Sequence, residues 1–213
     1  DLLAQGVQAI AVSLLWAFRN PVHERRVRDL VLGIDRDLYV GLSSEISPRI
    51  GEYGRSTTTV MSTQVGPRLR AYLNSLEADL AAKGFAGRLL VMQGSGGCIS
   101  ARDASRHAIV TIGSVLTGGV VGAQTLGRQL DHRNIIATDM GGTTFLVGLI
   151  LDGAPLTTGR AVIGKHSVNI PMVQIHTIGS GGGAIAWVDG GGNLRVGPRS
   201  AQASPGPACY GTG

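Results

Sequence analysis

The sequence predicts an α/β protein in which helices flank a mixed β-sheet. In the first half of the chain, short apolar runs typical of strands alternate with segments whose apolar residues have helical spacing. In the second half, strand-like runs follow one another with glycine-rich turns between them, as antiparallel hairpins do. Strands that alternate with helices define the α/β class, and the later hairpins make the expected sheet mixed.

The expected elements before residue 133 are short strands at 8–15, 39–43 and 88–92, and helices at 23–32, 67–83 and 114–130. The second of these helices has the clearest pattern, because Leu69, Leu73 and Leu80 recur on one face and Gly84 follows as a stop signal. Residues 45–59 are polar and rich in threonine, and they are expected to be irregular.

A series of strands is expected after residue 133. A buried strand over residues 134–138 delivers Asp139 at its end, and a return strand runs from Thr143 to residue 151 before a turn at Asp152-Gly153. Further strands are expected at 175–178, 184–188 and 194–196.

Composition excludes several classes of protein. The net charge is +5, but the arginines are scattered and aromatic residues make up only 4%, so no nucleic-acid-binding face is expected. No apolar run approaches the ~18 residues that a membrane span needs, so no membrane partner is expected. Cys98 and Cys209 have no CxxC partner and are expected to be reduced thiols of a cytoplasmic protein. The first residue is not Met, so the chain is expected to be a piece of a longer protein.

The segment around Asp139 has the chemistry of a phosphate-binding hairpin. Gly141 and Gly142 allow backbone N–H groups to approach phosphate oxygens, and Thr143 and Thr144 add hydroxyl donors. Asp139 supplies a hard oxygen ligand of the kind that Mg²⁺ takes together with water. The alternative is an ordinary hairpin with a glycine turn, which the short Asp-Met-Gly-Gly motif alone does not exclude.

Longer stretches carry a family resemblance. The segments DMGGTTF, IHTIGSGGGAIAWVD and LRVGPRSAQASPGPACYG, preceded by SLLWAFRNPVHERRV, SSEISPRIGEYGRSTTTV, VMQGSGG and GGVVGA, occur in the order found in the hydantoinase A/oxoprolinase family, which the chain resembles. That family includes the ATP-hydrolysing subunits of acetone-type carboxylases. The resemblance implies an incomplete ribonuclease-H-like fold of the actin, sugar-kinase and chaperone ATPase superfamily. It places the end of an N-terminal lobe at residues 1–60 and part of the core domain at residues 61–213.

The resemblance also implies a function. The expected reaction is ATP- and Mg²⁺-dependent opening of a cyclic amide, such as a hydantoin or oxoproline, with a partner subunit of the hydantoinase B type. The alternatives are ATP-dependent carboxylation of a ketone and a nucleotide-binding module without turnover. A second phosphate hairpin near the N-terminus of the family is expected outside these residues, because Asp-x-Gly-Gly-Thr occurs once here.

The residues that match the family's phosphate hairpin are Asp139, Gly141, Gly142, Thr143 and Thr144. The stretch that contains His176, Gly179, Gly181, Gly182 and Gly183 matches a glycine loop near the nucleotide, where the glycines hold phosphates or shape the substrate side and His176 carries a proton. A flexible bend and a structural histidine are the alternatives. Gly118, Gly119 and Gly122 match a helix start suited to an anion, or else a site of close helix packing.

The sequence departs from the family pattern where an aspartate usually follows DMGGTTF. Leu146 stands at that position, and Gln202 and Ser204 replace other usual residues near the end of the chain. An aspartate in the return strand would help to place metal or water. Leu146 therefore puts ATP hydrolysis in question, whereas Asp139 preserves phosphate and Mg²⁺ binding.

Overall fold

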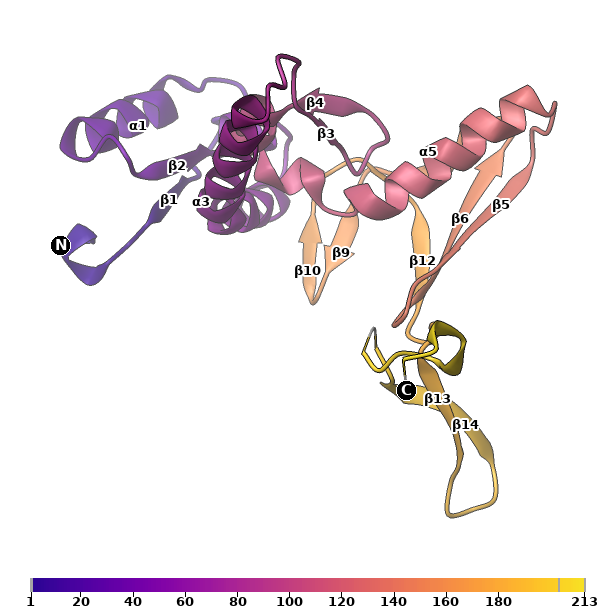
Figure 1. The fold of residues 1–213 in the computed structure, drawn as a ribbon. Coiled ribbons are helices and arrows are strands. Elements are labelled where there is room, and N and C mark those ends of the chain that lie inside the picture. The colour runs from indigo at the N-terminus through magenta and orange to yellow at the C-terminus, as the bar shows by residue number, and fades with distance from the viewer. Residues whose placement is uncertain (1, 203, 213) are drawn as a thin grey trace. The chain divides into compact units, whose positions relative to one another are not determined.

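The computed structural model describes residues 2–202 and 204–212, and the chain divides into two units (Figure 1). The first unit comprises Asp1–Ser114 and Thr157–Met172, and the second comprises Val115–Leu156 and Val173–Gly213. The boundary near residue 60, which the family resemblance implies, is not the boundary between these two compact units, and it stays a prediction. Helix α3 (Glu52–Ala82) runs without a break across that residue.

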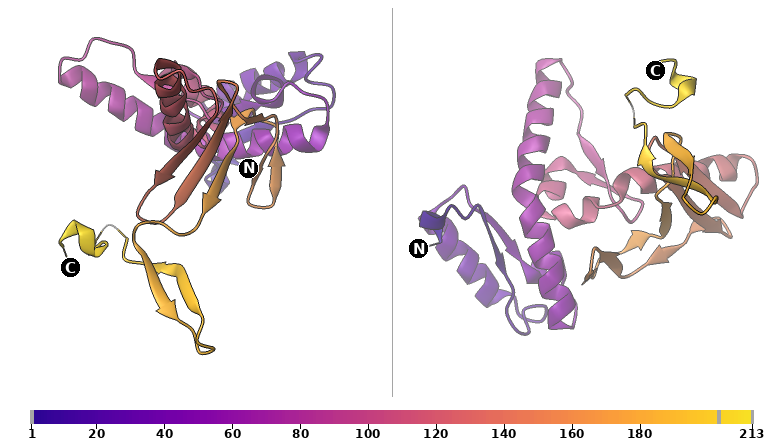
Figure 2. Two further views of the ribbon diagram at one scale, coloured as in Figure 1. Left: turned by 90° about the vertical axis from the view of Figure 1, so that its right-hand side faces the viewer. Right: turned by 90° about the horizontal axis from the view of Figure 1, so that it is seen from below.

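The first unit begins with a β-α-β arrangement. Strands β1 (Ala9–Val12) and β2 (Tyr39–Leu42) pair in parallel, and helix α1 (Val22–Ile34) connects them, as the apolar runs predicted. The pair lies between α1 and α3 (Figure 2). Parallel strands need such a crossover, because a tight turn can only join antiparallel neighbours.

Helix α3 is longer than the sequence predicted. Residues 45–59 were expected to be irregular, and this was wrong from Glu52 onward, where α3 begins, whereas residues 47–51 do lie outside helices and strands. The hydroxyl groups of Thr57, Thr58 and Thr59 donate hydrogen bonds to carbonyls four residues earlier in the helix. Thr58 and Thr59 are fully buried, so tertiary packing outweighs the low helix propensity of β-branched residues.

The rest of the first unit packs against α3 in small apolar clusters. One cluster centres on Leu73 and Ala104, and another on Ile109, Val168 and Ile170. The contributing elements are α2 (Ser43–Ile46), β3 (Leu90–Met92), β4 (Cys98–Ser100), α4 (Ala101–Arg106), the 3-10 turn Ala108–Thr111, β9 (Ala161–Ile163) and β10 (His166–Val168). The sequence did not predict α4, whose N-terminus is capped by the Ser100 side chain accepting from the Asp103 amide.

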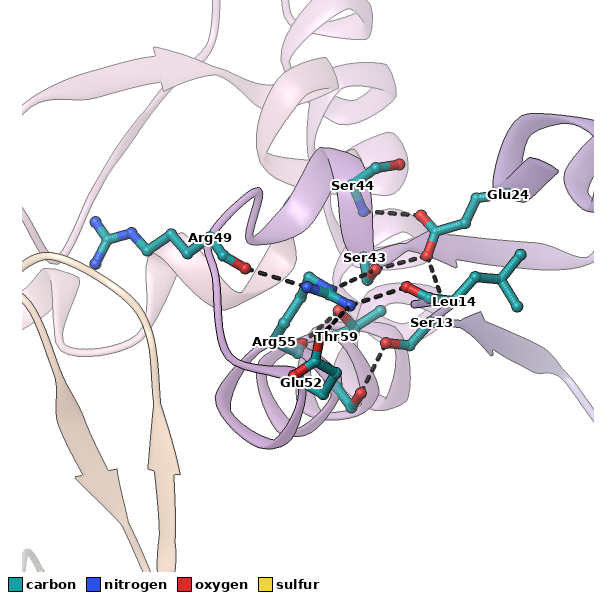
Figure 3. A network of polar contacts seen from close by, with 10 residues as sticks. Ser13, Leu14, Glu24, Ser43, Ser44, Arg49, Glu52, Arg55 and Thr59 are labelled. Atoms are coloured by element: carbon teal, nitrogen blue, oxygen red, sulfur yellow. Dashed lines mark hydrogen bonds and ion pairs between the residues drawn. The ribbon is translucent and has the colours of Figure 1, made fainter. Parts of the chain in front are cut away.

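A buried polar network joins α1, α2 and α3 (Figure 3). Arg55 is fully buried and donates hydrogen bonds to the Ser43 hydroxyl and to the Arg49 and Leu14 carbonyls. Glu24 is also fully buried, and its carboxylate accepts from the Leu14 amide, the Ser43 hydroxyl and the Ser44 amide. The Arg55 guanidinium therefore holds this network together.

The acidity of Glu24 gives the fold a pH dependence. Burial by itself raises the pKa of Glu24, but the hydrogen bonds from Ser43, Ser44 and Leu14 outweigh burial and lower the pKa below its usual 4.5. The stabilisation is therefore fully present above about pH 4.5 and is lost as the pH falls through the lower folded-state pKa. Urea unfolding between pH 7 and pH 3 should show this loss, and Glu24→Gln should flatten it. An equally steep loss in Glu24→Gln would assign the pH dependence to other groups.

The second unit is an antiparallel sheet with one long helix across it (Figure 1). The strand order is β12 (Ile175–Ile178), β6 (Phe145–Leu151) and β5 (Ile135–Met140), and β7 (Ala154–Pro155) also pairs with β6. Helix α5 (Ser114–Gln129) covers one face through a core of Val120, Ile150 and Val173. The hairpin of β13 (Ala184–Val188) and β14 (Leu194–Ser200) follows. The remaining short elements are Leu3–Gln5, β8 (Thr157–Thr158), β11 (Met172–Val173) and Ala208–Tyr210.

Two expectations about the sheets were wrong. The parallel pair and the antiparallel strands belong to separate sheets among the described residues, so no single mixed sheet forms there. The strand before Asp139 was expected to be buried, but Ile136 is 70% exposed and Met140 is 61% exposed. β5 is an edge strand that α5 covers on one face only, so its alternate side chains face outward.

Candidate functional site: the Asp139 hairpin

The turn between β5 and β6 is the centre of the candidate site. Asp139 and Met140 pair with Leu146 and Phe145, and the Gly141 amide donates to the Thr144 carbonyl to close the turn. The register therefore ends at Met140, and Gly141–Thr144 form a connection outside the ladder. The sequence predicted this hairpin and its turn correctly, apart from one to two residues at the strand ends.

The loop of Gly181, Gly182 and Gly183 holds the turn from one side. The Gly182 amide donates to the Gly141 carbonyl at 2.9 Å, and the Gly183 amide donates to the Gly142 carbonyl at 2.8 Å. A Cβ atom on Gly181 would lie 2.5 Å from the Gly141 carbonyl oxygen, so only glycine fits there. These contacts bring together two glycine segments that are 40 residues apart in sequence, counting from Gly141 to Gly181.

The loop also fixes where the hairpin amides point. In a planar trans peptide the C=O and the following N–H point in opposite directions. Because the Gly141 and Gly142 carbonyls point to the loop, the amides of Gly142 and Thr143 point away from it. Neither amide donates a hydrogen bond within residues 2–202 and 204–212. Two adjacent free N–H groups on one side of a turn form a concave donor pair of the kind that binds anions.

Gly141 and Gly142 themselves meet no internal obstacle. A Cβ atom on either residue would come no closer than 3.7 Å to its surroundings, which is an ordinary contact. Packing within the described residues therefore does not itself require glycine at either position. The hydroxyl groups of Thr143 and Thr144 have no partner within the described part of the chain, and they remain available as donors.

Asp139 lines a small cavity. It faces the side of the sheet that carries α5, because its cross-strand partner Leu146 and the next partner in the row, Thr177, share that face. A cavity of about 100 Å³ is lined by Asp139 and Leu146 together with residues of α5, including Gly119. Asp139 is exposed, whereas Leu146 is only 8% exposed. The aspartate that the family pattern has at position 146 would thus lie beside Asp139.

His176 lies on the other face of the sheet. It pairs with Val147, and successive residues of a strand point to opposite faces, so His176 and Asp139 do not share a face. The structure therefore brings together Asp139, the hairpin and the loop of Gly181–183 but not His176. Sequence reasoning missed Thr177, which shares the face of Asp139 and which only the strand register could identify.

The glycines of α5 are not at the helix start. Helix α5 begins at Ser114, so Gly118, Gly119 and Gly122 lie within it, where the amides of an α-helix donate to carbonyls four residues earlier. A Cβ atom on any of the three would meet nothing within 4 Å. Neither the expected anion-binding helix start nor the alternative of close packing at these glycines is therefore what the structure shows.

Asp139 is the single acidic residue at this site. Within residues 2–202 and 204–212, no group of three or more His, Cys, Asp or Glu side chains could hold a metal ion. A lone carboxylate fits Mg²⁺, which is held in nucleotide sites by one or two carboxylates, water and the phosphates themselves. It does not fit zinc, which needs three or four protein ligands.

Sequence reasoning also missed the segment that supports the glycine loop. The Ser200 hydroxyl donates to the Gly142 carbonyl at 3.4 Å, and the Ala201 amide donates to the Gly183 carbonyl at 2.7 Å. Ser200 lies 58 residues after Gly142, so no local pattern indicates the contact.

None of the helices in the described part of the chain combines the length and the apolar character that a membrane span requires.

The α/β fold and the glycine hairpin define a family. The hydantoinase/oxoprolinase profile matches residues 55–213, and the chain belongs to this family. The chain is 38% identical to the acetophenone carboxylase gamma subunit of Aromatoleum aromaticum, covering 100% of this chain and 30% of that protein. It is 34% identical to the 5-oxoprolinase of Saccharomyces cerevisiae, covering 98% of this chain and 16% of that protein.

The fold of the chain is also similar to that of solved structures. The crystal structure of the ATP-dependent caprolactamase from Pseudomonas jessenii matches with a TM-score of 0.81 and 32% identity, covering 99% of this chain and 30% of that chain. The chain thus spans less than a third of the relatives it matches. These relatives include both amide-hydrolysing and ketone-carboxylating proteins by name, so family membership does not choose between the two reactions.

Proposed function

We propose that this chain carries one phosphate-binding half of an ATP-dependent enzyme that opens a cyclic amide of the hydantoin or oxoproline type. The proposed setting is an actin-like ATPase fold, in which a second hairpin outside these residues faces the one at Asp139. The observation that carries the proposal is the pair of outward-pointing amides at Gly142 and Thr143, next to an exposed carboxylate.

The chain's own residues supply positioning and charge. The amides of Gly142 and Thr143 bind oxygens of the ATP phosphates, and the hydroxyl groups of Thr143 and Thr144 complete the contact. The amides of Gly182 and Gly183 are already used by the hairpin carbonyls, so this loop orients the hairpin and does not itself contact the phosphates through them. Asp139 holds Mg²⁺, which neutralises phosphate charge when bound.

The reaction follows from the weakness of an amide as an electrophile. The γ-phosphoryl group moves from ATP to the amide carbonyl oxygen, which releases ADP and activates the carbonyl carbon. Water then attacks that carbon and the ring C–N bond breaks, which leaves an amine and an acyl phosphate. A second water hydrolyses the acyl phosphate to the carboxylate and inorganic phosphate. His176 as a proton carrier for this step stays a prediction, and its position on the opposite face of the sheet from Asp139 means that it would act on a different part of the site.

Two other functions have specific support. The similarity to a carboxylase subunit favours phosphoryl activation of a ketone or of bicarbonate for a partner subunit of the hydantoinase B type. The buried Leu146 beside Asp139 favours a module that binds nucleotide without turnover, because a second acidic group is missing there. Both alternatives keep the phosphate contacts of the hairpin. A cytoplasmic location is part of the same proposal.

The test is phosphate release by the full-length protein with its partner subunit. Hydantoin, oxoproline, caprolactam and acetone plus bicarbonate would each be supplied with Mg·ATP. A cyclic amide should stimulate phosphate release. Asp139→Asn should lower kcat about a hundredfold or more, because charge stabilisation of the transition state is lost. Asp131→Asn, a matched change at an exposed position outside the site, should leave kcat unchanged.

The outcomes separate the candidates. Stimulation only by the ketone with bicarbonate would favour the carboxylase reaction. ATP binding without phosphate release under any condition would favour the module without turnover, and Leu146→Asp should then restore release. Full phosphate release by Asp139→Asn would contradict the assignment of the hairpin in both catalytic candidates, and undiminished Mg·ATP binding would contradict it in the module without turnover.

A further inference from the structure

The Gly142 carbonyl is held by two donors. It accepts a hydrogen bond from the Gly183 amide at 2.8 Å and another from the Ser200 hydroxyl at 3.4 Å. The Gly141 carbonyl, by comparison, accepts from one donor among the described residues, the Gly182 amide at 2.9 Å. The peptide that follows Gly142 therefore has a side-chain contact that the preceding peptide lacks.

A turn at the end of β14 fixes the direction of the Ser200 hydroxyl. Its oxygen accepts a hydrogen bond from the Gln202 amide at 3.1 Å, as serine does in local turns. Ala201, the residue between them, donates its amide to the Gly183 carbonyl at 2.7 Å, so the same turn also holds the glycine loop. Because the hydroxyl oxygen is an acceptor on the Gln202 side, its proton is available for the Gly142 carbonyl.

Glycine at position 183 gives the hydroxyl access to this carbonyl. A Cβ atom there would lie 2.9 Å from the Gly142 oxygen, 3.0 Å from the Ser200 hydroxyl oxygen and 3.2 Å from the Gln202 nitrogen. These three atoms are the acceptor, the donor and the group that orients the donor. They surround one glycine closely, and a side chain at position 183 would push them apart.

A hydrogen bond at a carbonyl also affects the amide of the same peptide. The peptide group is planar, so a fixed Gly142 carbonyl fixes the direction of the Thr143 N–H. Donation to the carbonyl oxygen also polarises the peptide, and linked hydrogen bonds strengthen one another by about 10–30% per bond. The Thr143 amide donates no hydrogen bond within residues 2–202 and 204–212, so it can pass this effect to a ligand.

We propose that Ser200 is a positioning residue for the phosphate site. Its hydroxyl holds and polarises the peptide between Gly142 and Thr143, so that the Thr143 amide donates to an ATP phosphate oxygen. This inference rests on the proposed function, and Ser200 acts through the peptide and not on the nucleotide. The 3.4 Å contact is long for a hydroxyl donor, and hydrogen bonds of unliganded sites often tighten in the complex.

The test compares Ser200→Ala, which removes the hydroxyl, with Ser200→Thr, which keeps it, in the full-length protein. Isothermal titration should show Mg·ATP affinity lower by about three- to tenfold in Ser200→Ala, the effect of one net hydrogen bond. Ser200→Thr should bind Mg·ATP nearly as the parent protein does. Thr125→Ala is the matched control and should leave affinity unchanged, because Thr125 is an exposed residue of α5 whose hydroxyl donates within its own helix.

Hydrogen exchange separates positioning from a merely structural role. In the presence of Mg·ATP, Ser200→Ala should lower the protection of the Thr143 amide more than that of the Gly142 amide. The reason is that the Gly142 amide belongs to the peptide of the Gly141 carbonyl, which accepts from Gly182 and not from Ser200. Equal loss at both amides would show that the variant only loosens the loop, and it would overturn the proposal.

The binding data separate this inference from the proposed function. Undiminished Mg·ATP affinity in Ser200→Ala, or affinity in Ser200→Thr as low as in Ser200→Ala, would overturn the role of Ser200 alone. A parent protein that binds no Mg·ATP would overturn the phosphate site itself and this inference with it.

Discussion

Gly181→Ala is expected to weaken Mg·ATP binding by the full-length protein at least about tenfold, whereas Gly182→Ala is expected to preserve it. A Cβ atom at position 181 would lie 2.5 Å from the Gly141 oxygen, 2.6 Å from the Thr144 nitrogen and 2.8 Å from the Thr143 carbonyl carbon. These are backbone atoms, so the loop or the hairpin must move. Overpacking of this kind costs about 1–3 kcal/mol. Movement of the loop would release the Gly141 and Gly142 carbonyls, and the amides behind them would lose their orientation.

The neighbouring position is the matched control. A Cβ atom on Gly182 would come no closer than 3.7 Å to the Gly141 oxygen, which is an ordinary contact. Isothermal titration with Mg·ATP should show affinity reduced at least about tenfold for Gly181→Ala, which corresponds to ~1.4 kcal/mol. Affinity for Gly182→Ala should equal that of the parent protein. If both variants bind alike, the loop does not set the geometry of the hairpin.

Arg55→Met is expected to destabilise the first unit by about 3–5 kcal/mol, the cost of removing one partner from a buried charged network. Methionine fills much of the arginine volume but donates nothing. The Leu14 and Arg49 carbonyls and the Ser43 hydroxyl would each lose a hydrogen bond in a buried setting. The Ser43 hydroxyl connects Arg55 to the Glu24 carboxylate, so Glu24 would also lose the nearby positive charge.

Chemical unfolding of the full-length protein, followed by hydrogen exchange of α3, would measure this loss. Arg49→Met is the control, because the Arg49 side chain is exposed and makes a single hydrogen bond to the Gly159 carbonyl. It should cost no more than about 1 kcal/mol. Equal costs for the two variants would show that burial of the Arg55 guanidinium is not what stabilises the unit.

Local patterns in the sequence identified much of this fold. The apolar runs that became β1, β2 and β12 and the amphipathic run that became α1 were found close to their observed bounds, because periodicity reports local structure directly. The N-terminal half of α3 was missed because Thr57–Thr59 and Pro67 disfavour helices locally. Their hydroxyl bonds and burial against the rest of the first unit become visible only in three dimensions.

The candidate site also has a part that local sequence patterns predict and a part that only the three-dimensional structure shows. The Asp-Met-Gly-Gly-Thr-Thr pattern located the hairpin, because its chemistry lies within six consecutive residues, Asp139 to Thr144. The different roles of the two glycine segments could not be predicted. They depend on the hydrogen bonds that the Gly182 and Gly183 amides donate to the hairpin carbonyls. The separation of His176 from Asp139 required the register of β12 on β6, which no local signal specifies.

Hydrogen exchange of the Gly142 and Thr143 amides in the full-length protein, with and without Mg·ATP, tests the central claim most directly. Both amides are free of internal hydrogen bonds among the described residues, so they should exchange rapidly without nucleotide. Mg·ATP should slow the exchange of both, and Asp139→Asn should weaken the protection. Unchanged exchange at these two amides under saturating Mg·ATP would contradict the assignment of this hairpin as a phosphate site.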